Sequence, residues 1–509
     1  MPPLPLTGRD LTIDDVIEVA IGRRRVELEG AATERMRASR AVIERLVAGG
    51  DIVYGVTTGF GDLADVRIDP DQTAELQRNL VRSHAAAVGE PLPEVVVRGM
   101  LLLRANTLAV GLSGARVEVA QLLVDMLNRA VHPVVPSRGS LGASGDLAPL
   151  AHLALVMIGE GEALVDGAGP GPGAEALTRA GLSPLELAAK EGLALLNGTQ
   201  LMSAVGALAL HDAQRLAATA DVIGAMSLEA MLGTARAFAD ALVAARPHPG
   251  QRAVAAHLRG LLAHSEIAAS HAESAHKVQD PYSLRCMPQV HGAARDALAE
   301  LERVLRVEIN AATDNPLVFP SGEVISGGNF HGEPVALALD YATMAVTELA
   351  SISERRTARL VDAHLSGLPA FLAERPGLES GLMIAHYTAA ALVNELQTLA
   401  HPASVDTIPT SANQEDHVSM GATAALHLRE AVDRTEAVLA IEALCAAQGV
   451  DFRAPLAPGT GVRAAHAAIR ERVAHLDADR SPAPDIATAR ELIRSGRLLS
   501  AADGATARA

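Results

Sequence analysis

Residues 139–161 combine residue types that are unusual for an ordinary loop, because glycine, serine and alanine crowd into GSLGASGD ahead of an apolar stretch. The pattern predicts a tight loop that feeds a helix beginning near Leu147, with Asp146 at the N-cap position. Taken alone, the tripeptide Ala143-Ser144-Gly145 indicates only a glycine-serine turn. Its chemical meaning depends on the other motifs of the chain.

Six further motifs follow the same order along the chain as those of a known family. They are YGVTTGFG at 54–61 with Tyr54, LQRNLVRSHAAAVGEPL at 76–92 with Ser83 and His84, EGLALLNGTQ at 191–200 with Asn197, QDPYSLRCMPQVHGA at 279–293 with Gln279, Tyr282 and Arg285, GGNFHGEP at 327–334 with Phe330, and SANQEDHVSMG at 411–421 with Glu415. With the GSLGASGD loop, they resemble the aromatic amino acid ammonia-lyases, the family of the histidine and phenylalanine enzymes. The resemblance extends from about Asp14 to Arg494.

This resemblance implies that Ala143, Ser144 and Gly145 cyclise into 4-methylideneimidazol-5-one, with no external cofactor. The residue types suit the chemistry, because the amide nitrogen of Gly145 must attack the carbonyl of Ala143 and a residue without Cβ permits that close approach. Ser144 then loses water and leaves an electron-poor alkene. Such an electrophile takes the role that a bound cofactor has in other enzymes.

The family resemblance also assigns roles in removing ammonia from an α-amino acid. The methylidene derived from Ser144 is expected to take the substrate amine covalently and make it able to leave. Tyr54 is the expected general base, although a phenol with a pKa of ~10 needs a lowered pKa or a strong local field near neutrality. Glu415 is the alternative base for the β-proton, and the sequence leaves both open.

Substrate binding is expected from a second group of matching positions. Arg285 would hold the α-carboxylate in a bidentate pair and so fix the reacting carbon. Asn197, Gln279 and Tyr282 match positions that hydrogen-bond the cofactor or the carboxylate, and Phe330 matches a residue that lines the pocket.

Two positions indicate the substrate. The pair Ser83-His84, together with Glu415, matches the histidine-specific branch, and an imidazole both donates and accepts hydrogen bonds. A phenyl ring would leave the carboxylate desolvated and unpaired. We therefore expect L-histidine as substrate and urocanate and ammonia as products. One departure from that branch is Asn394-Glu395-Leu396-Gln397, where a lysine is usual at the last position.

Sibling enzymes of the same family and two other classes of protein are the alternatives. A tyrosine or phenylalanine ammonia-lyase is disfavoured by Ser83-His84 and Glu415, whereas an aromatic aminomutase of the same family stays open. A non-catalytic helical scaffold is disfavoured by the intact tripeptide, Tyr54 and Arg285. A fumarase-type lyase would need a GSSxMPxKxN motif, which is absent from the sequence.

The elements that must position these residues are mainly helical. Hydrophobic residues make up 49% of the 509-residue chain, mostly as alanine, leucine and valine. Alanine and leucine lead the ranking of helix propensity, which favours helices. Apolar periodicity predicts long helices at about 34–48, 94–112, 114–130, 199–245, 288–311, 331–362, 379–400 and 418–448. Strands are expected only at 52–56, 163–165 and 324–325.

These elements predict an all-α fold, a long helical bundle of the ammonia-lyase and fumarase type with minor short strands near the N-terminal portion. Three parts are expected: residues 1–197 with the cofactor-forming loop, residues 198–450 as the central bundle, and residues 451–509 as a C-terminal helical appendix. By resemblance, a homotetramer would build each active site from several subunits.

Charge and cysteine content exclude other classes. The net charge of −17 disfavours nucleic acid and anionic membranes as partners. Two cysteines, no basic and apolar leader, and no long uncharged apolar run predict a cytoplasmic protein without a membrane span. No metal site is expected, because His271 and His276 in HAESAH are five residues apart and do not share a helix face.

Cyclisation predicts a change in the mass of the intact chain. Closing the ring and dehydrating Ser144 should make the protein lighter than its sequence mass by two water molecules. Mass spectrometry of the intact protein checks this, with Ser144→Ala expected to keep the fold and lose activity. An unshifted mass in the wild type contradicts cofactor formation.

Overall fold

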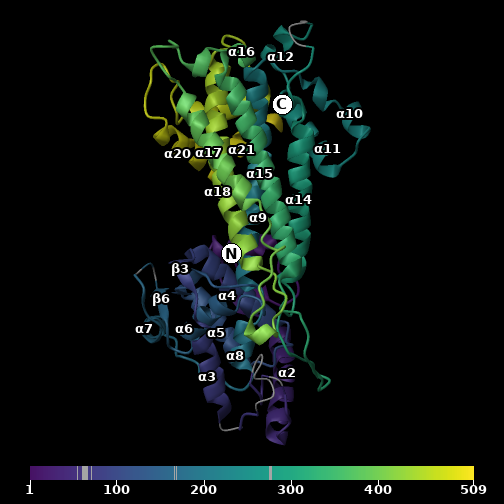
Figure 1. Ribbon diagram of the computed structural model, residues 1–509, viewed down its shortest axis with the longest axis vertical. Helices are drawn as coiled ribbons and strands as arrows, with labels where there is room; N and C mark the ends of the chain where they lie inside the picture. Colours follow the sequence, from purple (N-terminus) through teal and green to yellow (C-terminus); the bar gives the residue numbers. More distant parts are fainter. Residues whose placement is uncertain are drawn as a thin grey trace. The chain divides into compact units, whose positions relative to one another are not determined.

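Helices dominate the computed structural model (Figure 1), which describes residues 1–53, 55–59, 67–69, 72–165, 167, 169–273 and 278–508. The chain divides into two compact units, each assembled from separate segments of sequence. The first comprises Met1–Ala209, Leu301–Asp340 and Pro402–Leu426, and the second comprises Leu210–Glu300, Tyr341–His401 and His427–Ala509. Each unit is described by itself.

The first unit is organised around α4 (Glu94–Ala109), in which every residue from Val96 onward is buried. From Val96 onward the helix has no solvent-exposed face, so its neighbours must cover it on all sides. The other helices of the unit are α1 (Ile13–Ala20), α2 (Gly30–Gly49), α3 (Thr73–His84), α5 (Val117–Asn128), α6 (Leu147–Met157), α7 (Gly173–Arg179), α8 (Glu191–Leu196) and the short turn η5 (Ser411–Asn413).

Short strands pair at the edges of the first unit. β1 (Leu4–Leu6) pairs in parallel with β2 (Val26–Leu28), and β3 (Val88–Pro91) pairs antiparallel with β5 (Pro136–Arg138). β6 (Glu162–Val165) lies between β4 (Val131–Pro133) and β7 (Gly171–Pro172), and β8 (Leu317–Val318) pairs with β9 (Val324–Ile325). The predicted class, mainly α with minor short strands, is confirmed.

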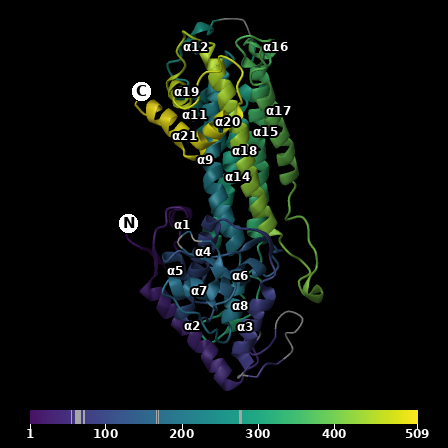
Figure 2. The same ribbon diagram turned by 90° about the vertical axis from the view of Figure 1, so that its left-hand side faces the viewer.

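The second unit is a bundle of long helices that run side by side in both views (Figures 1 and 2). These helices are α9 (Gln200–Ala230), α14 (Met287–Glu308), α15 (Glu333–Val361), α17 (Met383–Leu399) and α18 (Gly421–Asp451). Four of them are divided between the units, since residues 200–209, 301–308, 333–340 and 421–426 belong to the first unit. The shorter elements of the unit are η3 (Ala235–Phe238), α10 (Asp240–Ala244), α11 (Pro249–Leu261), α12 (Glu266–Ser270), α13 (Tyr282–Arg285), α16 (Ala363–Ser366), η4 (Ala370–Leu372), α19 (Thr460–Arg470), α20 (Ala483–Arg494) and α21 (Arg497–Thr506).

Small residues allow the bundle helices to pack closely. A Cβ added to Gly449 of α18 would lie 2.9 Å from the Cβ of Ala230 at the end of α9. Buried alanine, valine and leucine side chains fill the remaining space, among them Val222, Leu349 and Leu439. The scarcity of aromatic residues therefore reflects close helix packing by small side chains.

Two of the predicted elements differ in the structure, one helix in its end point and one strand in its existence. The helix predicted over 199–245 ends at Ala230, where Leu232 adopts a φ of +51° and the chain turns into η3 and α10. The strand expected at 52–56 is wrong, because residues 55–57 form a turn. A hydrogen bond of 2.9 Å from the Val53 amide to Thr57 Oγ1 closes that turn.

Helix α15 is long and apolar enough to cross a membrane by length and composition alone. However, 67% of its most apolar stretch is buried inside the protein. Burial of this extent is typical of a core helix in a globular protein.

One ion pair in the first unit is fully buried. Lys190 Nζ lies 2.6 Å from Asp314 Oδ2, and neither side chain is exposed to solvent. Asp314 Oδ1 also accepts a hydrogen bond of 2.7 Å from the Asn315 amide. Since a buried charge without its partner is costly, this pair fixes the segment before Asn197 against the loop at Asp314.

Lys190→Met should lower the free energy of unfolding by ~3–5 kcal/mol, because it leaves the Asp314 carboxylate buried and unpaired. Urea denaturation followed by circular dichroism measures the loss. The control is Arg23→Met, which removes the solvent-accessible pair of Arg23 with Glu94 and should cost less than ~1 kcal/mol. Equal losses in the two variants would contradict this interpretation of Lys190.

Candidate active site

The tripeptide Ala143-Ser144-Gly145 lies in a turn that precedes α6 and contacts the segment before α9. Gly145 has a φ of +81° and forms a parallel bridge with Gly198. The Gly198 amide donates to the Ser144 carbonyl over 3.2 Å, and the Asp146 amide donates to the Gly198 carbonyl over 2.7 Å. A Cβ on Gly145 would lie 2.1 Å from the Gly198 oxygen, so only glycine fits.

The side chain of Asp146 stabilises this turn through hydrogen bonds to neighbouring segments. Its backbone occupies the predicted N-cap position of α6, but its side chain makes no hydrogen bond to that helix. Instead, Asp146 Oδ2 accepts hydrogen bonds of 2.9 and 3.0 Å from the amides of Leu201 and Met202 in the first turn of α9. Ser140 Oγ donates to Asp146 Oδ1 over 2.9 Å. One buried carboxylate therefore joins the tripeptide turn to the start of a long helix.

Burial raises the pKa of Asp146 to about 6, although its three hydrogen bonds act in the opposite direction. The cause is the loss of solvation of the charged form. Neutral hydrogen-bond donors therefore hold this buried carboxylate.

The Glu415 side chain contacts the tripeptide at Ser144. Ser144 Oγ donates to Glu415 Oε1 over 3.1 Å, although the two residues are 271 positions apart. Thr410 Oγ1 donates to the second oxygen, Oε2, over 3.0 Å. Backbone hydrogen bonds in both directions between Thr410 and Glu415 close the loop that holds the carboxylate.

The segment after Glu415 contacts the tripeptide turn a second time. The Met420 amide donates to the Leu141 carbonyl over 2.8 Å, and Ser419 Oγ donates to the Gly142 carbonyl over 3.1 Å. A Cβ on Gly142 would lie 2.1 Å from Ser419 Oγ. The turn is therefore enclosed by residues 419–421 as well as by Gly198.

His84 lies at the end of α3 and is half-buried. Its Nδ1 lies 2.9 Å from the Leu80 carbonyl, which requires a proton on Nδ1 and leaves Nε2 as an acceptor. Burial lowers the pKa of His84, while the Leu80 carbonyl and the Glu415 carboxylate raise it less strongly. A neutral imidazole close to Glu415 results. Ser83 Oγ donates to the same Leu80 carbonyl over 3.1 Å.

Asn197 and Phe330 belong to segments that support the same region. Asn197 is buried, its Nδ2 donates to the Asn315 carbonyl over 2.9 Å, and its carbonyl accepts from the buried Arg104. Phe330 is half-buried in the turn before α15. Next to it, the ring of His331 stacks on that of His417 with centroids 5.7 Å apart, which joins this turn to the segment of Glu415.

The other predicted binding residues lie in the second unit, on and just before α13. Gln279, Tyr282 and Arg285 line a cavity of about 370 Å³. The Arg285 guanidinium lies 4.6 Å from the centre of the Tyr282 ring, a cation–π contact. Arg285 Nε is buried and has no hydrogen-bond partner among the described residues. A cationic guanidinium that lines a cavity suits an anionic group.

Tyr54, the expected base, lies outside the described residues. On either side of it, the Val53 amide donates to Thr57 Oγ1, and the Gly55 amide donates to Thr58 Oγ1 over 3.2 Å. The described part of this turn is thus closed by its two threonines.

Several residues that the sequence did not single out contribute to these sites. Thr410 fixes the Glu415 carboxylate, Arg104 fixes the Asn197 carbonyl, and Arg359 lines the cavity of Arg285. Arg104 and Arg359 act across distant segments, which spacing along the chain does not encode, whereas Thr410 acts within the loop that it closes with Glu415. Residues 394–397 of α17 form the segment that lacks the usual lysine. Within it, Leu396 is fully buried and belongs to the hydrophobic core.

The fold and the enclosed tripeptide turn define a helical carbon–nitrogen lyase. The chain belongs to the aromatic amino acid lyase family, whose model matches residues 11–471. It is 58% identical to a histidine ammonia-lyase of Anaeromyxobacter sp. (strain K) over 508 residues, which cover 98% of this chain and 100% of that one.

Solved structures share the fold over the whole chain. A histidine ammonia-lyase from Trypanosoma cruzi is similar with a TM-score of 0.92 and 43% identity, covering 99% of this chain and 95% of that one. A tyrosine aminomutase from Streptomyces globisporus has a TM-score of 0.94 and 38% identity, covering 99% of both chains.

The contact between Gly145 and Gly198 leads to a test of how the turn favours cyclisation. Gly198 has a φ of +131°, and a Cβ there would lie 2.6 Å from the Thr313 carbonyl oxygen. Gly198→Ala should therefore displace the turn at a cost of ~1–3 kcal/mol and slow the loss of two waters by roughly 5- to 100-fold. Intact mass followed over time after purification measures the rate.

The matched control is Gly322→Ala, which has a similar φ of +103° but no atom within 4 Å of the added Cβ. This variant should lose both waters at the wild-type rate. If Gly198→Ala also matures at that rate, the turn does not need the glycine contact.

Proposed function

We propose that the chain eliminates ammonia from L-histidine to give trans-urocanate. The observation that carries this proposal is the Ser144–Glu415 hydrogen bond beside His84, because it joins the tripeptide turn to two groups that suit an imidazole. The names of the similar histidine ammonia-lyases support the same substrate.

The turn fits a group formed from Ala143, Ser144 and Gly145, because the close approach at Gly145 leaves no room for a side chain. When formed, the methylideneimidazolone supplies the electrophile that makes the substrate amine able to leave. Hydrogen bonds of Asp146 and Gly198 fix the turn, and residues 419–421 enclose it. The scaffold is therefore organised before the substrate binds.

Glu415 and His84 would recognise the substrate imidazole. Thr410 occupies Oε2 of Glu415, whereas Oε1 accepts only from Ser144 Oγ among the described residues, so loss of that hydroxyl as water frees Oε1. A free carboxylate oxygen accepts from an imidazole N–H, and the neutral His84 ring offers Nε2 as another acceptor. A phenyl or phenol ring has no ring N–H for these groups.

Removal of the β-proton is assigned to Tyr54, with Glu415 as the alternative base. The second candidate function is that of an aromatic aminomutase. The likeness of the fold to that of a tyrosine aminomutase supports it as a candidate. A protein that only eliminates ammonia releases urocanate, whereas an aminomutase returns the amine to the β-carbon. A non-catalytic scaffold would do neither.

The substrate carboxylate is assigned to Arg285, with Gln279 and Tyr282 beside it, and the roles of Asn197 and Phe330 are to support the cofactor and line the pocket. We propose a homotetramer in the cytoplasm with active sites shared between subunits. Two exposed apolar pairs support assembly with further copies of the chain: Tyr341 and Met344 on α15, and Ile384 and Tyr387 on α17.

The direct experiment supplies the purified protein separately with L-histidine, L-tyrosine and L-phenylalanine and follows near-ultraviolet absorbance of the unsaturated acid. Urocanate from L-histidine alone is expected. Without urocanate formation the proposal fails, and a β-amino acid product from any of the three would establish the aminomutase instead.

Glu415→Gln should reduce kcat/KM for L-histidine by ~10²–10⁴-fold, because the neutral amide loses both the anionic acceptor and the alternative base. Initial rates of urocanate formation at saturating and limiting substrate measure the change. Glu395→Gln is the control, since Glu395 is exposed on α17 and pairs only with Arg434 among the described residues. Wild-type rates in Glu415→Gln would exclude Glu415 from the site.

A further inference from the structure

Helix α13 has only four residues, yet it bears Tyr282 and Arg285. A single helical turn has almost no stability of its own, so its position must be imposed by its surroundings. Tyr282 is 71% exposed, and therefore little of the Tyr282 side chain anchors the helix. The contacts that fix α13 are made by other residues of this segment.

The start of this segment is held by Asp280, which is buried. Its Oδ2 accepts a hydrogen bond of 2.7 Å from the Thr234 amide. In the middle of α13, the Ser283 carbonyl faces Arg356 of α15, whose guanidinium nitrogen is 3.5 Å away.

Arg356 is in turn fixed by Glu442 of α18. Both side chains are fully buried, and two hydrogen bonds of 2.5 and 2.8 Å join the guanidinium to the carboxylate. Ser227 Oγ of α9 donates to Glu442 over 2.6 Å. Three long helices therefore meet at a planar ion pair whose remaining nitrogen points to α13.

The same guanidinium nitrogen contacts the helix that follows α13. Arg356 lies 3.3 Å from Nε2 of His291 in α14, and His291 Nδ1 lies 2.7 Å from Asp221 Oδ1. The ring is neutral and protonated on Nδ1 in this arrangement, so it accepts from Arg356 and donates to Asp221. Arg356 thus touches α13 and α14 together.

Steric contact completes the anchor. Met287, at the start of α14, is fully buried against Gly224 of α9. A Cβ on Gly224 would lie 2.4 Å from Met287 Sδ and 3.5 Å from Arg356 Cζ. The absent side chain at Gly224 is what lets both residues lie against α9.

We propose that Arg356, held by Glu442 and by the space at Gly224, is a positioning residue that sets Arg285 at the distance required to bind the substrate carboxylate. The inference rests on the proposed function. A bidentate pair is sensitive to displacement, and an error of ~1 Å in a positioned group costs as much as 10²-fold in rate. Arg356 itself does not contact the substrate.

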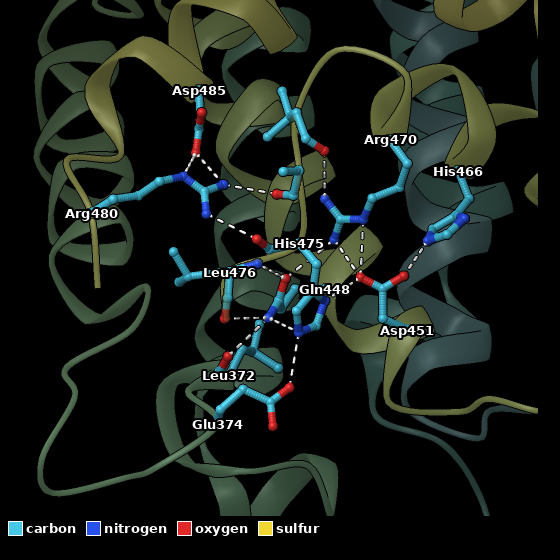
Figure 3. A network of polar contacts seen from close by, with 12 residues as sticks. Leu372, Glu374, Gln448, Asp451, His466, Arg470, His475, Leu476, Arg480 and Asp485 are labelled. Carbon is cyan, nitrogen blue, oxygen red and sulfur yellow. Dashed lines mark hydrogen bonds and ion pairs between the residues drawn. The ribbon is translucent and has the colours of Figure 1, made fainter. Parts of the chain in front are cut away.

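The first test variant is Arg356→Lys, which keeps a charge opposite Glu442 but cannot serve Glu442, Ser283 and His291 together. Its matched control is Arg470→Lys. Arg470 likewise pairs with a carboxylate, Asp451, and donates to a carbonyl, that of Val473, in a separate network of the same unit (Figure 3). Both exchanges remove an ion pair and a contact with a carbonyl, and of the two arginines Arg356 is the one that contacts α13.

The second variant is Gly224→Ala, which displaces Met287 without changing any charge. Its control is Gly449→Ala, which also adds a methyl group to a packed contact between bundle helices. Agreement between the two test variants excludes an effect of charge alone.

The measurements are KM and kcat for L-histidine and the inhibition constant of L-histidinol, in which a hydroxymethyl group replaces the carboxylate. We expect Arg356→Lys and Gly224→Ala to raise KM by ~10-fold or more, with a smaller change in kcat and less than about twofold in the histidinol constant. The controls should match the wild type.

Equal weakening of L-histidine and L-histidinol would overturn the proposal, because it would indicate general damage to the pocket. An unchanged KM in the folded variants would also overturn it. Absence of urocanate from the wild type is a separate result, since it refutes the proposed function before any variant is compared.

Discussion

The contact between Gly145 and Gly198 is the constraint on which the described site depends. Two backbones approach so closely that a Cβ on Gly145 would lie 2.1 Å from a carbonyl oxygen. The adjacent Asp146 side chain then caps α9, so the turn and the bundle helix share one buried carboxylate. Because the turn cannot move without breaking these contacts, Ser144 stays directed at Glu415.

Some charged side chains hold backbone segments, and others line a cavity. Buried ion pairs such as Lys190–Asp314 and Arg356–Glu442 hold backbone segments. By contrast, Arg285 Nε has no hydrogen-bond partner among the described residues. A guanidinium that lines a cavity is suited to bind an anionic ligand, whereas the buried ion pairs are suited to position the segments around it.

The sequence predicted the helical class, because apolar periodicity in α15 and α18 is long and regular. It also brought Ser144 and Glu415 into one site, but only through the resemblance of their motifs to a family. It could not predict that Asp146 caps α9 rather than α6, since the choice between two helix ends is made by tertiary packing. Arg356 was missed for the same reason, because it lies in no motif and its partner Glu442 is distant in sequence. Thr410 was missed although its partner Glu415 is only five residues away, because Thr410 lies just before the motif at 411–421. The role assigned to Tyr54 and the division of the chain into three parts stay predictions.

The most direct test of the account compares maturation with catalysis in one series of samples. Preparations of the wild type taken at successive times after synthesis differ in the fraction of chains that lack two waters. The account predicts that the rate of urocanate formation rises in proportion to that fraction and extrapolates to zero when no chain has matured. Turnover of L-histidine by chains of full sequence mass would contradict it.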